Sequence, residues 1–284
     1  MPVAVITDST AHLPEGFADR FAVRVVPLHV LIDGATARDG IDVGPDALAE
    51  ALGDRCQVST ARPTPGEFAA VFREVLEAGA DAVVSIHLSS EMSGTWESAV
   101  LAAREVGPEV VRVVDSRSTA MGLGFAVLHA AKAASGGAAL AEVENAALSA
   151  VRSSKALFVV ETLEHLRRGG RIGAAAALLG TALAVKPVLH IEDGRIEPLE
   201  KVRTMHRAVA RLVELAERAA GDGPVEIAVH HLASPERAVE LANRLEERLM
   251  VSGGCLVSEL GAVIGAHTGP GVLGVVVQRR PSLP

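Results

Sequence analysis

Short apolar runs alternate with helical patterns along the first half of the chain, and this alternation restricts the fold more than any other feature. Val3–Thr7, Ala82–Leu88 and Val110–Val114 are apolar enough for buried parallel strands. Between them, residues 68–76 keep the spacing of an amphipathic helix. Because strands that alternate with helices pair in parallel, we expect an α/β domain with a helix-covered parallel sheet over residues 1–155.

The second half of the chain has a different pattern. Residues 185–191 and 196–202 are strand-like runs on either side of Asp193-Gly194, a dipeptide typical of a hairpin turn. Two further strands are expected at Ala262–His267 and Val272–Val277. Hairpin strands combined with helices predict a second, mixed α+β domain over residues 156–284, and a ligand site between the two domains.

A helix start is strongly marked after residue 63. Thr64 has the residue type of an N-cap, Pro65 suits the first helical position, and Glu67 completes a capping box. Thr60 is therefore predicted to lie in a loop just before this helix. Its hydroxyl can serve a ligand or only hydrate the loop, and the sequence is neutral between these.

Polar residues follow two of the predicted strands, at the edge of the sheet where ligands bind in open α/β folds. Asp8 ends the first strand, and the segment Ser89-Ser90-Glu91-Met92-Ser93-Gly94-Thr95 connects the central strand to a helix. Hydroxyls beside the free N–H groups of a helix start can hold an oxygen anion. The same residues are also ordinary helix caps, so both interpretations stay open.

Composition argues against several classes of partner. The net charge is −8 without a Lys/Arg-rich run, and aromatic residues make up only 2% of the chain, so a nucleic-acid partner is not expected. A pocket in such a chain has to be lined by aliphatic side chains. This suits an aliphatic ligand better than a flat one.

Membrane, disulfide and metal signals are missing from the sequence. No stretch of about 18 apolar residues is present and no basic leader precedes Val3, so we expect a cytoplasmic protein without stable membrane insertion. Cys56 and Cys255 are far apart and lack metal-site spacing. Neither a disulfide, a metal nor a cofactor is predicted.

His267 is the main candidate for proton chemistry. It precedes Thr268 and a glycine-rich turn, so it can bind a carboxylate, act as a base or cap the turn. Pairing it with Ser93 would give a serine hydrolase, but no nucleophile-elbow motif surrounds Ser93. His230 and His231 are adjacent on a predicted strand and point to opposite faces, which disfavours a shared metal.

Ordered motifs along nearly the whole chain resemble those of the DegV family of bacterial lipid-binding proteins. They comprise residues 7–9, 60–64, 89–95, 115–116, 166–172, 186–188, 201–204 and 267–271. The resemblance implies a two-domain α/β protein that binds one long-chain fatty acid between its domains and has no turnover of its own. It also implies that an ATP-dependent fatty acid kinase subunit receives the bound acid, for acyl phosphate formation and phospholipid synthesis.

The resemblance also assigns roles to residues of this chain. Thr60 and Ser93 would bind the carboxylate, with His267 and Thr268 nearby, while Arg171 would face the kinase. Arg171 belongs to a basic group with Arg167 and Arg168, which otherwise fits solvated helix-end charges.

One departure concerns the same site. Ala61-Arg62 replaces the Ser-Gln that usually follows the threonine, so Arg62 adds a cation, and we include Arg62 and Gly94 as possible binding residues. Two alternatives stay open: a phosphate-handling enzyme related to dihydroxyacetone kinase folds, without a P-loop to support it, and a Ser93/His267 hydrolase.

Overall fold

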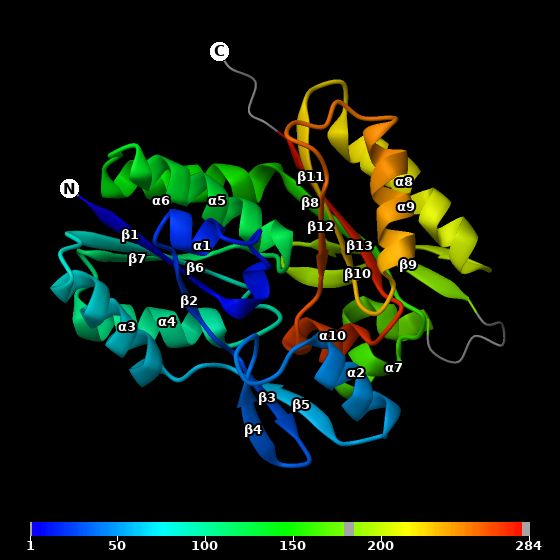
Figure 1. The fold of residues 1–284 in the computed structure, drawn as a ribbon, viewed down its shortest axis with the longest axis horizontal. Helices are drawn as coiled ribbons and strands as arrows, with labels where there is room; N and C mark the ends of the chain where they lie inside the picture. Colours follow the sequence, from blue (N-terminus) through cyan, green and yellow to red (C-terminus); the bar gives the residue numbers. More distant parts are fainter. Residues whose placement is uncertain (1, 179–184, 280–284) are drawn as a thin grey trace.

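A four-stranded parallel sheet forms the centre of the first half in the computed structural model, which describes residues 2–178 and 185–279 (Figure 1). Its strand order is β2-β1-β6-β7. The strands are β1 (Val3–Asp8), β2 (Arg24–Val26), β6 (Ala82–His87) and β7 (Val111–Asp115). All six residues of β6 are buried, as its apolar sequence predicts.

Helices cover both faces of this parallel sheet (Figure 1). They are α3 (Pro65–Glu77) and α4 (Thr95–Val106) on one face, and α5 (Met121–Ser135) and α6 (Leu140–Ser153) on the other. Phe68 and Phe72 of α3 are fully buried against the sheet. The predicted helix-covered parallel sheet is confirmed.

A six-stranded mixed sheet forms the second half, in the order β10-β9-β8-β13-β11-β12. Its strands are β8 (Ser154–Val159), β9 (Lys186–Glu192), β10 (Arg195–Val202), β11 (Val225–His231), β12 (Leu256–Glu259) and β13 (Leu273–Arg279). The β9–β10 hairpin turns at Asp193-Gly194, as predicted. The boundary predicted at residue 155 falls at the start of β8, and the division into two domains stays a prediction.

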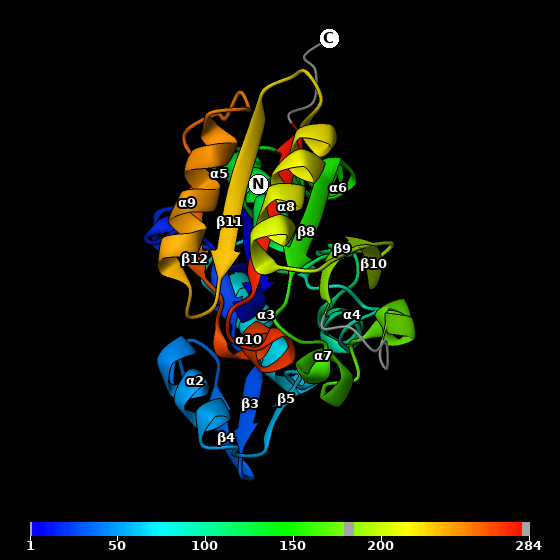
Figure 2. The same ribbon diagram turned by 90° about the vertical axis from the view of Figure 1, so that its right-hand side faces the viewer.

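The two faces of the mixed sheet have different neighbours. Helices α8 (Met205–Ala220) and α9 (Pro235–Glu246) cover one face, as Figure 2 shows. On the other face, Ala156 of β8 and Val276 of β13 pack against Met121 and Phe125 of α5. This second face therefore turns toward the first half of the chain.

A third, three-stranded antiparallel sheet was not predicted. It consists of β3 (His29–Ile32), β4 (Ala35–Arg38) and β5 (Val58–Ala61), in the order β4-β3-β5, and it lies near α2 (Pro45–Gly53). The apolar run over residues 23–31 is divided between β2 and β3 because Pro27 cannot donate to a strand ladder. Thr60 lies in β5, so its predicted placement in a loop is wrong.

The strand predicted at Ala262–His267 is also wrong. These residues form α10 (Ala262–Thr268), so His267 lies at the end of a helix. A short apolar run has no period that separates strand from helix. Gly265 lets α10 pack closely, because a Cβ there would lie 2.4 Å from Cδ2 of Leu48 in α2.

Four short elements complete the described chain. They are the 3-10 helices η1 (Ser9–Ala11) and η2 (Gly173–Leu178) and the helices α1 (Phe17–Arg20) and α7 (Glu164–Arg168).

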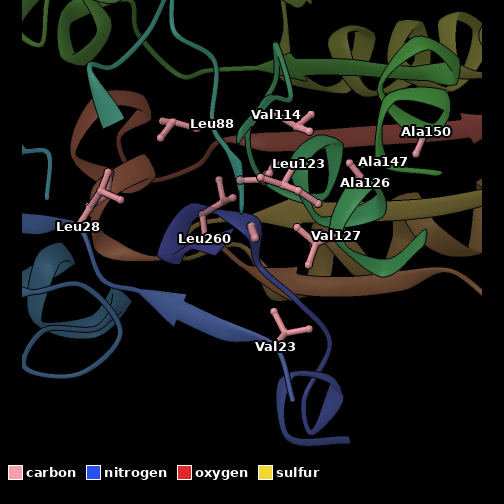
Figure 3. Close-up of a cluster of buried hydrophobic side chains, with 14 of the residues drawn as sticks. Val23, Leu28, Leu88, Val114, Leu123, Ala126, Val127, Ala147, Ala150 and Leu260 are labelled. Carbon is pink, nitrogen blue, oxygen red and sulfur yellow. The ribbon is translucent and has the colours of Figure 1, made fainter. Parts of the chain in front are cut away.

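The largest apolar cluster joins the two halves of the chain (Figure 3). Leu123 and Val127 of α5 belong to it, together with Leu28, Leu88 and Leu260, which lie in loops. The last three side chains also form part of a cavity wall. The core of the protein therefore continues directly into that cavity.

The predicted capping box at α3 is present, and its contribution can be measured. Thr64 Oγ1 accepts a hydrogen bond from Glu67 N, and the Glu67 carboxylate accepts one from Thr64 N at 2.7 Å. Thr64→Ala should lower the free energy of unfolding by about 1 kcal/mol in urea titration. Thr64→Ser, which keeps the hydroxyl, is the control. Equal losses in both variants would show that the cap does not stabilise α3.

Candidate functional site

A cavity lies between the loops that follow the parallel strands and the face of the mixed sheet that also packs against α5. It contains about 970 Å³ of space free of protein atoms, its open mouth included. Its wall takes residues from both halves of the chain, among them Leu88 and Met92 after β6 and Phe158 and Val276 in the mixed sheet.

Most of the cavity wall is aliphatic. Representative side chains are Leu28, Leu166, Ile191, Ile196, Val263 and Val272. Phe158 contributes the one phenyl ring among the described lining residues. The expectation of an aliphatic pocket, drawn from the low aromatic content, agrees with this wall.

All predicted site residues except Gly94, which directly follows the lining residue Ser93, come together in the cavity wall. Thr60, Ser93, His267 and Thr268 all line it, and Arg62 and Arg171 do so as well. These six residues are called the polar cluster below. They come from elements that are distant in the sequence, so their meeting depends on the tertiary fold.

One hydrogen bond connects the N-terminal and C-terminal parts of the polar cluster. His267 Nε2 and Thr60 Oγ1 are 2.8 Å apart. Pairing of β5 with β3 fixes Thr60, and α10 fixes His267. Gly169 leaves room for the imidazole, because a Cβ at this position would lie 2.0 Å from His267 Nδ1.

Two arginines connect the cluster to the loop before α4. Arg171 Nε donates to the carbonyl oxygen of Met92 at 2.8 Å, and Arg62 donates to that of Gly94 at 3.2 Å. Gly94 is needed for this contact, because its Cβ would lie 1.8 Å from the Arg62 guanidinium. Arg171 is half-buried in the cavity wall, whereas Arg167 and Arg168 pair with Glu164 at the surface.

Ser93 lies at the N-terminal end of α4. Its Oγ accepts a hydrogen bond from Thr95 N at 3.3 Å and is 2.9 Å from Thr95 Oγ1. The N-cap position of α4 is taken by Gly94, and Ser93 precedes it while still accepting from the first N–H of the helix. Ser93 also lines the cavity, next to the first turn of a helix, where N–H groups favour an anion. The two interpretations of this serine are compatible.

Burial keeps the histidine of the polar cluster uncharged. Removal of its ring from water, with a further contribution from the Arg171 guanidinium, lowers the pKa of His267 from 6.5 to about 4. Its Nδ1 atom is buried and has no hydrogen-bond partner among the described residues. A neutral imidazole, hydroxyls and a nearby guanidinium together can receive a carboxylate.

No hydrogen bond joins Ser93 to His267 in the described structure: Ser93 contacts Thr95, and His267 contacts Thr60. A Ser-His-Asp arrangement does exist elsewhere: His87 Nε2 is 2.6 Å from Ser85 Oγ, and His87 Nδ1 is 3.0 Å from Asp8 Oδ2. All three side chains are fully buried, so no substrate reaches them. Asp8 also accepts from Thr10 N, so its predicted cap role is confirmed, and the trio joins β1 to β6.

His230 lies in the cavity wall, which the sequence did not indicate. Burial, with a smaller effect of His12, lowers the pKa of His230 to about 3. Its ring nitrogens contact Ser258 Oγ and the backbone N–H of Met121. Within residues 2–178 and 185–279, no group of three or more His, Cys, Asp or Glu residues could hold a metal ion.

Comparison with known proteins identifies the family. A model described as DegV, an uncharacterised protein family, matches residues 2–280. The chain belongs to the DegV family. A DegV domain-containing protein of Streptomyces coelicolor is 53% identical over 98% of this chain and 99% of its own length.

Solved DegV structures share the whole fold. A DegV family protein from Thermus thermophilus, described for its fatty acid binding, superposes with a TM-score of 0.93 at 37% identity, covering 98% of this chain and 99% of its own. DegV of Bacillus subtilis, described as a fatty acid binding protein, gives 0.88 at 34% identity, covering 99% of this chain and 100% of its own. In the described part of this chain, no helix is both long and apolar enough to cross a bilayer.

The buried histidines predict a loss of stability in acid. Burial lowers the pKa of His12 and of His267 to about 4, whereas unfolded histidines titrate near 6.5. The unfolded state therefore binds more protons between these values, and stability falls as the pH decreases from about 6.5 toward 4. At pH 5 each such histidine should cost about 2 kcal/mol of unfolding free energy relative to pH 7.5.

Urea titrations at several pH values measure this loss. His267→Asn should show a shallower decline in acid than the unsubstituted protein, and His206→Asn, at an exposed position of α8, is the control. Identical declines with and without His267 would contradict the assignment of a buried neutral imidazole.

Proposed function

We propose that this DegV protein binds one long-chain fatty acid, with its tail in the aliphatic cavity and its carboxylate at the polar cluster. The observation that carries the proposal is the joining of a mainly aliphatic cavity to one group of hydroxyls, arginines and a neutral imidazole. The fatty acid binding described for the structures from T. thermophilus and B. subtilis supports it.

Contact with the aliphatic wall would supply most of the free energy of fatty acid binding. Burial of about 15 methylene groups at about 0.8 kcal/mol each gives roughly 12 kcal/mol before the costs of association. The tail can therefore dominate binding, while the polar cluster sets the orientation of the acid.

The hydroxyls of the polar cluster differ in whether their proton is free to be donated to a carboxylate. Thr268 Oγ1 donates to the carbonyl oxygen of Ile264 at 3.0 Å, which commits its proton. Ser93 can accept from Thr95 and still donate its own proton to a ligand, and Thr60 can do the same when His267 donates to it. Thr60 and Ser93 are thus the better donors to a carboxylate, and an unpaired buried carboxylate would be costly.

We propose in addition that the protein has no turnover of its own and presents the carboxylate to a separate ATP-dependent fatty acid kinase. The acyl phosphate so formed would enter phospholipid synthesis, and the protein would act in the cytoplasm. The motif resemblance supports this role. The wall of the cavity, with residues from both parts of the chain, supports a division into residues 1–155 and 156–284 with the ligand between them.

Removal of the donor hydroxyls tests the headgroup site. Thr60→Val and Ser93→Ala should each weaken palmitate binding about 10- to 100-fold, the usual effect of losing a hydrogen bond to a charged group. Native mass spectrometry of the purified protein, before and after palmitate addition, measures occupancy. Thr36→Val, at an exposed position of β4, is the matched control.

Two results would contradict the proposed function. One is an unsubstituted protein that takes up no fatty acid. The other is an unchanged affinity in both Thr60→Val and Ser93→Ala, which would place the carboxylate elsewhere.

Arg171→Ala separates a headgroup role from a kinase-contact role. If Arg171 faces the kinase, the variant should keep its palmitate affinity and lose acyl phosphate production when mixed with the kinase and ATP. Because Arg171 is half-buried in the cavity wall beside Met92, the palmitate affinity of the variant is measured together with its acyl phosphate production. A fall in affinity that accounts for the whole loss of product would contradict the kinase-contact role.

A further inference from the structure

Gly274 occupies an unusual place for a glycine. It lies in β13, a central strand of the mixed sheet, and pairs with Phe158 of β8 on one side and His230 of β11 on the other. Glycine in a central strand weakens the strand, since it costs more conformational entropy than other residues and packs no side chain. The protein therefore tolerates a destabilising residue here.

The backbone conformation at residue 274 does not require a glycine. Gly274 is not among the glycines with positive φ, so its conformation is open to any residue. A Cβ built on it would have its nearest neighbours at 3.7 Å, namely Cβ of His230, the carbonyl oxygen of Leu157 and Cβ of Phe158. These are ordinary van der Waals distances, so an alanine would fit against the protein atoms.

Gly265 and Gly169 differ from Gly274 in the space around them. A Cβ at those positions would lie 2.4 Å from Leu48 and 2.0 Å from His267, respectively. Packing within the protein therefore requires glycine at both. At Gly274, in contrast, the surrounding protein atoms leave room for a Cβ.

That free space belongs to the cavity. Gly274 lines the cavity, and so do its two pairing partners, Phe158 and His230. Directly paired residues project from the same face of a sheet, so the missing side chain leaves a gap between a phenyl and an imidazole ring. A glycine with no other role in a strand is typical of a place where a ligand approaches the backbone.

We propose that Gly274 is a specificity-determining residue for the length of the acyl chain. The chain passes over the cavity face of the sheet at Gly274, between Phe158 and His230, and the missing side chain sets the length of chain accepted. The inference rests on the proposed fatty acid binding. A straight methylene chain has no branch wider than the chain itself, so it fits a gap left by one missing side chain. The carboxylate at the polar cluster then remains the fixed end from which length is measured.

Side chains added at this position test the proposal. Myristate and stearate affinities are measured by competition in native mass spectrometry for the unsubstituted protein, Gly274→Ala and Gly274→Val. The ratio of stearate to myristate affinity should fall in both variants, by about tenfold or more for Gly274→Val. The added side chain takes up cavity space at residue 274, so it weakens binding only of an acyl chain long enough to reach that residue. Acids that co-purify with the variants should be correspondingly shorter.

Gly53→Ala is the matched control, since it adds the same methyl group at α2 with no protein atom within 4 Å and outside the cavity wall. Its affinity ratio should equal that of the unsubstituted protein. Gly274→Ala should keep or raise the melting temperature, so it keeps the test valid if Gly274→Val does not fold.

The outcomes separate this inference from the proposed function. Binding by the unsubstituted protein with an unchanged ratio in Gly274→Ala and Gly274→Val would overturn the role of Gly274 alone. Equal weakening of both acids would overturn it as well. No fatty acid uptake by the unsubstituted protein would overturn both proposals.

Discussion

The hydrogen bond between Thr60 and His267 is the contact on which the candidate site depends. It joins residues that are 207 positions apart and unites β5, from the small antiparallel sheet, with α10, from the last part of the chain. Close approach of Gly169 to the His267 ring and of Gly265 to Leu48 makes this meeting possible. The polar cluster is therefore a product of tertiary packing.

The mixed sheet gives the cluster its apolar counterpart. One face is buried under α8 and α9, so its Val and Leu residues stabilise the fold directly. The opposite face packs partly against α5 and partly lines the cavity. A ligand tail would complete the burial of that face, which couples binding to stability because a ligand held only by the folded state shifts the unfolding equilibrium.

Local sequence signals predicted the elements that local physics determines. The mainly apolar run Ala82–His87 gave a central parallel strand, Thr64 with Glu67 gave a capping box, and Asp193-Gly194 gave a hairpin. The motif resemblance supplied the site residues, all of which lie in or beside the cavity wall. The geometry was not predictable, because α10 comes from an apolar run without a period and the space at Gly274 depends on strand register.

A crystal structure of the protein with bound stearate is the most direct test of the central claim, since it shows both ends of the ligand. The account predicts carboxylate oxygens within hydrogen-bond distance of the Thr60 and Ser93 hydroxyls and a tail that passes over Gly274 between Phe158 and His230. A carboxylate that contacts His230 in place of Thr60 and Ser93, or a stearate bound outside the cavity, would contradict it.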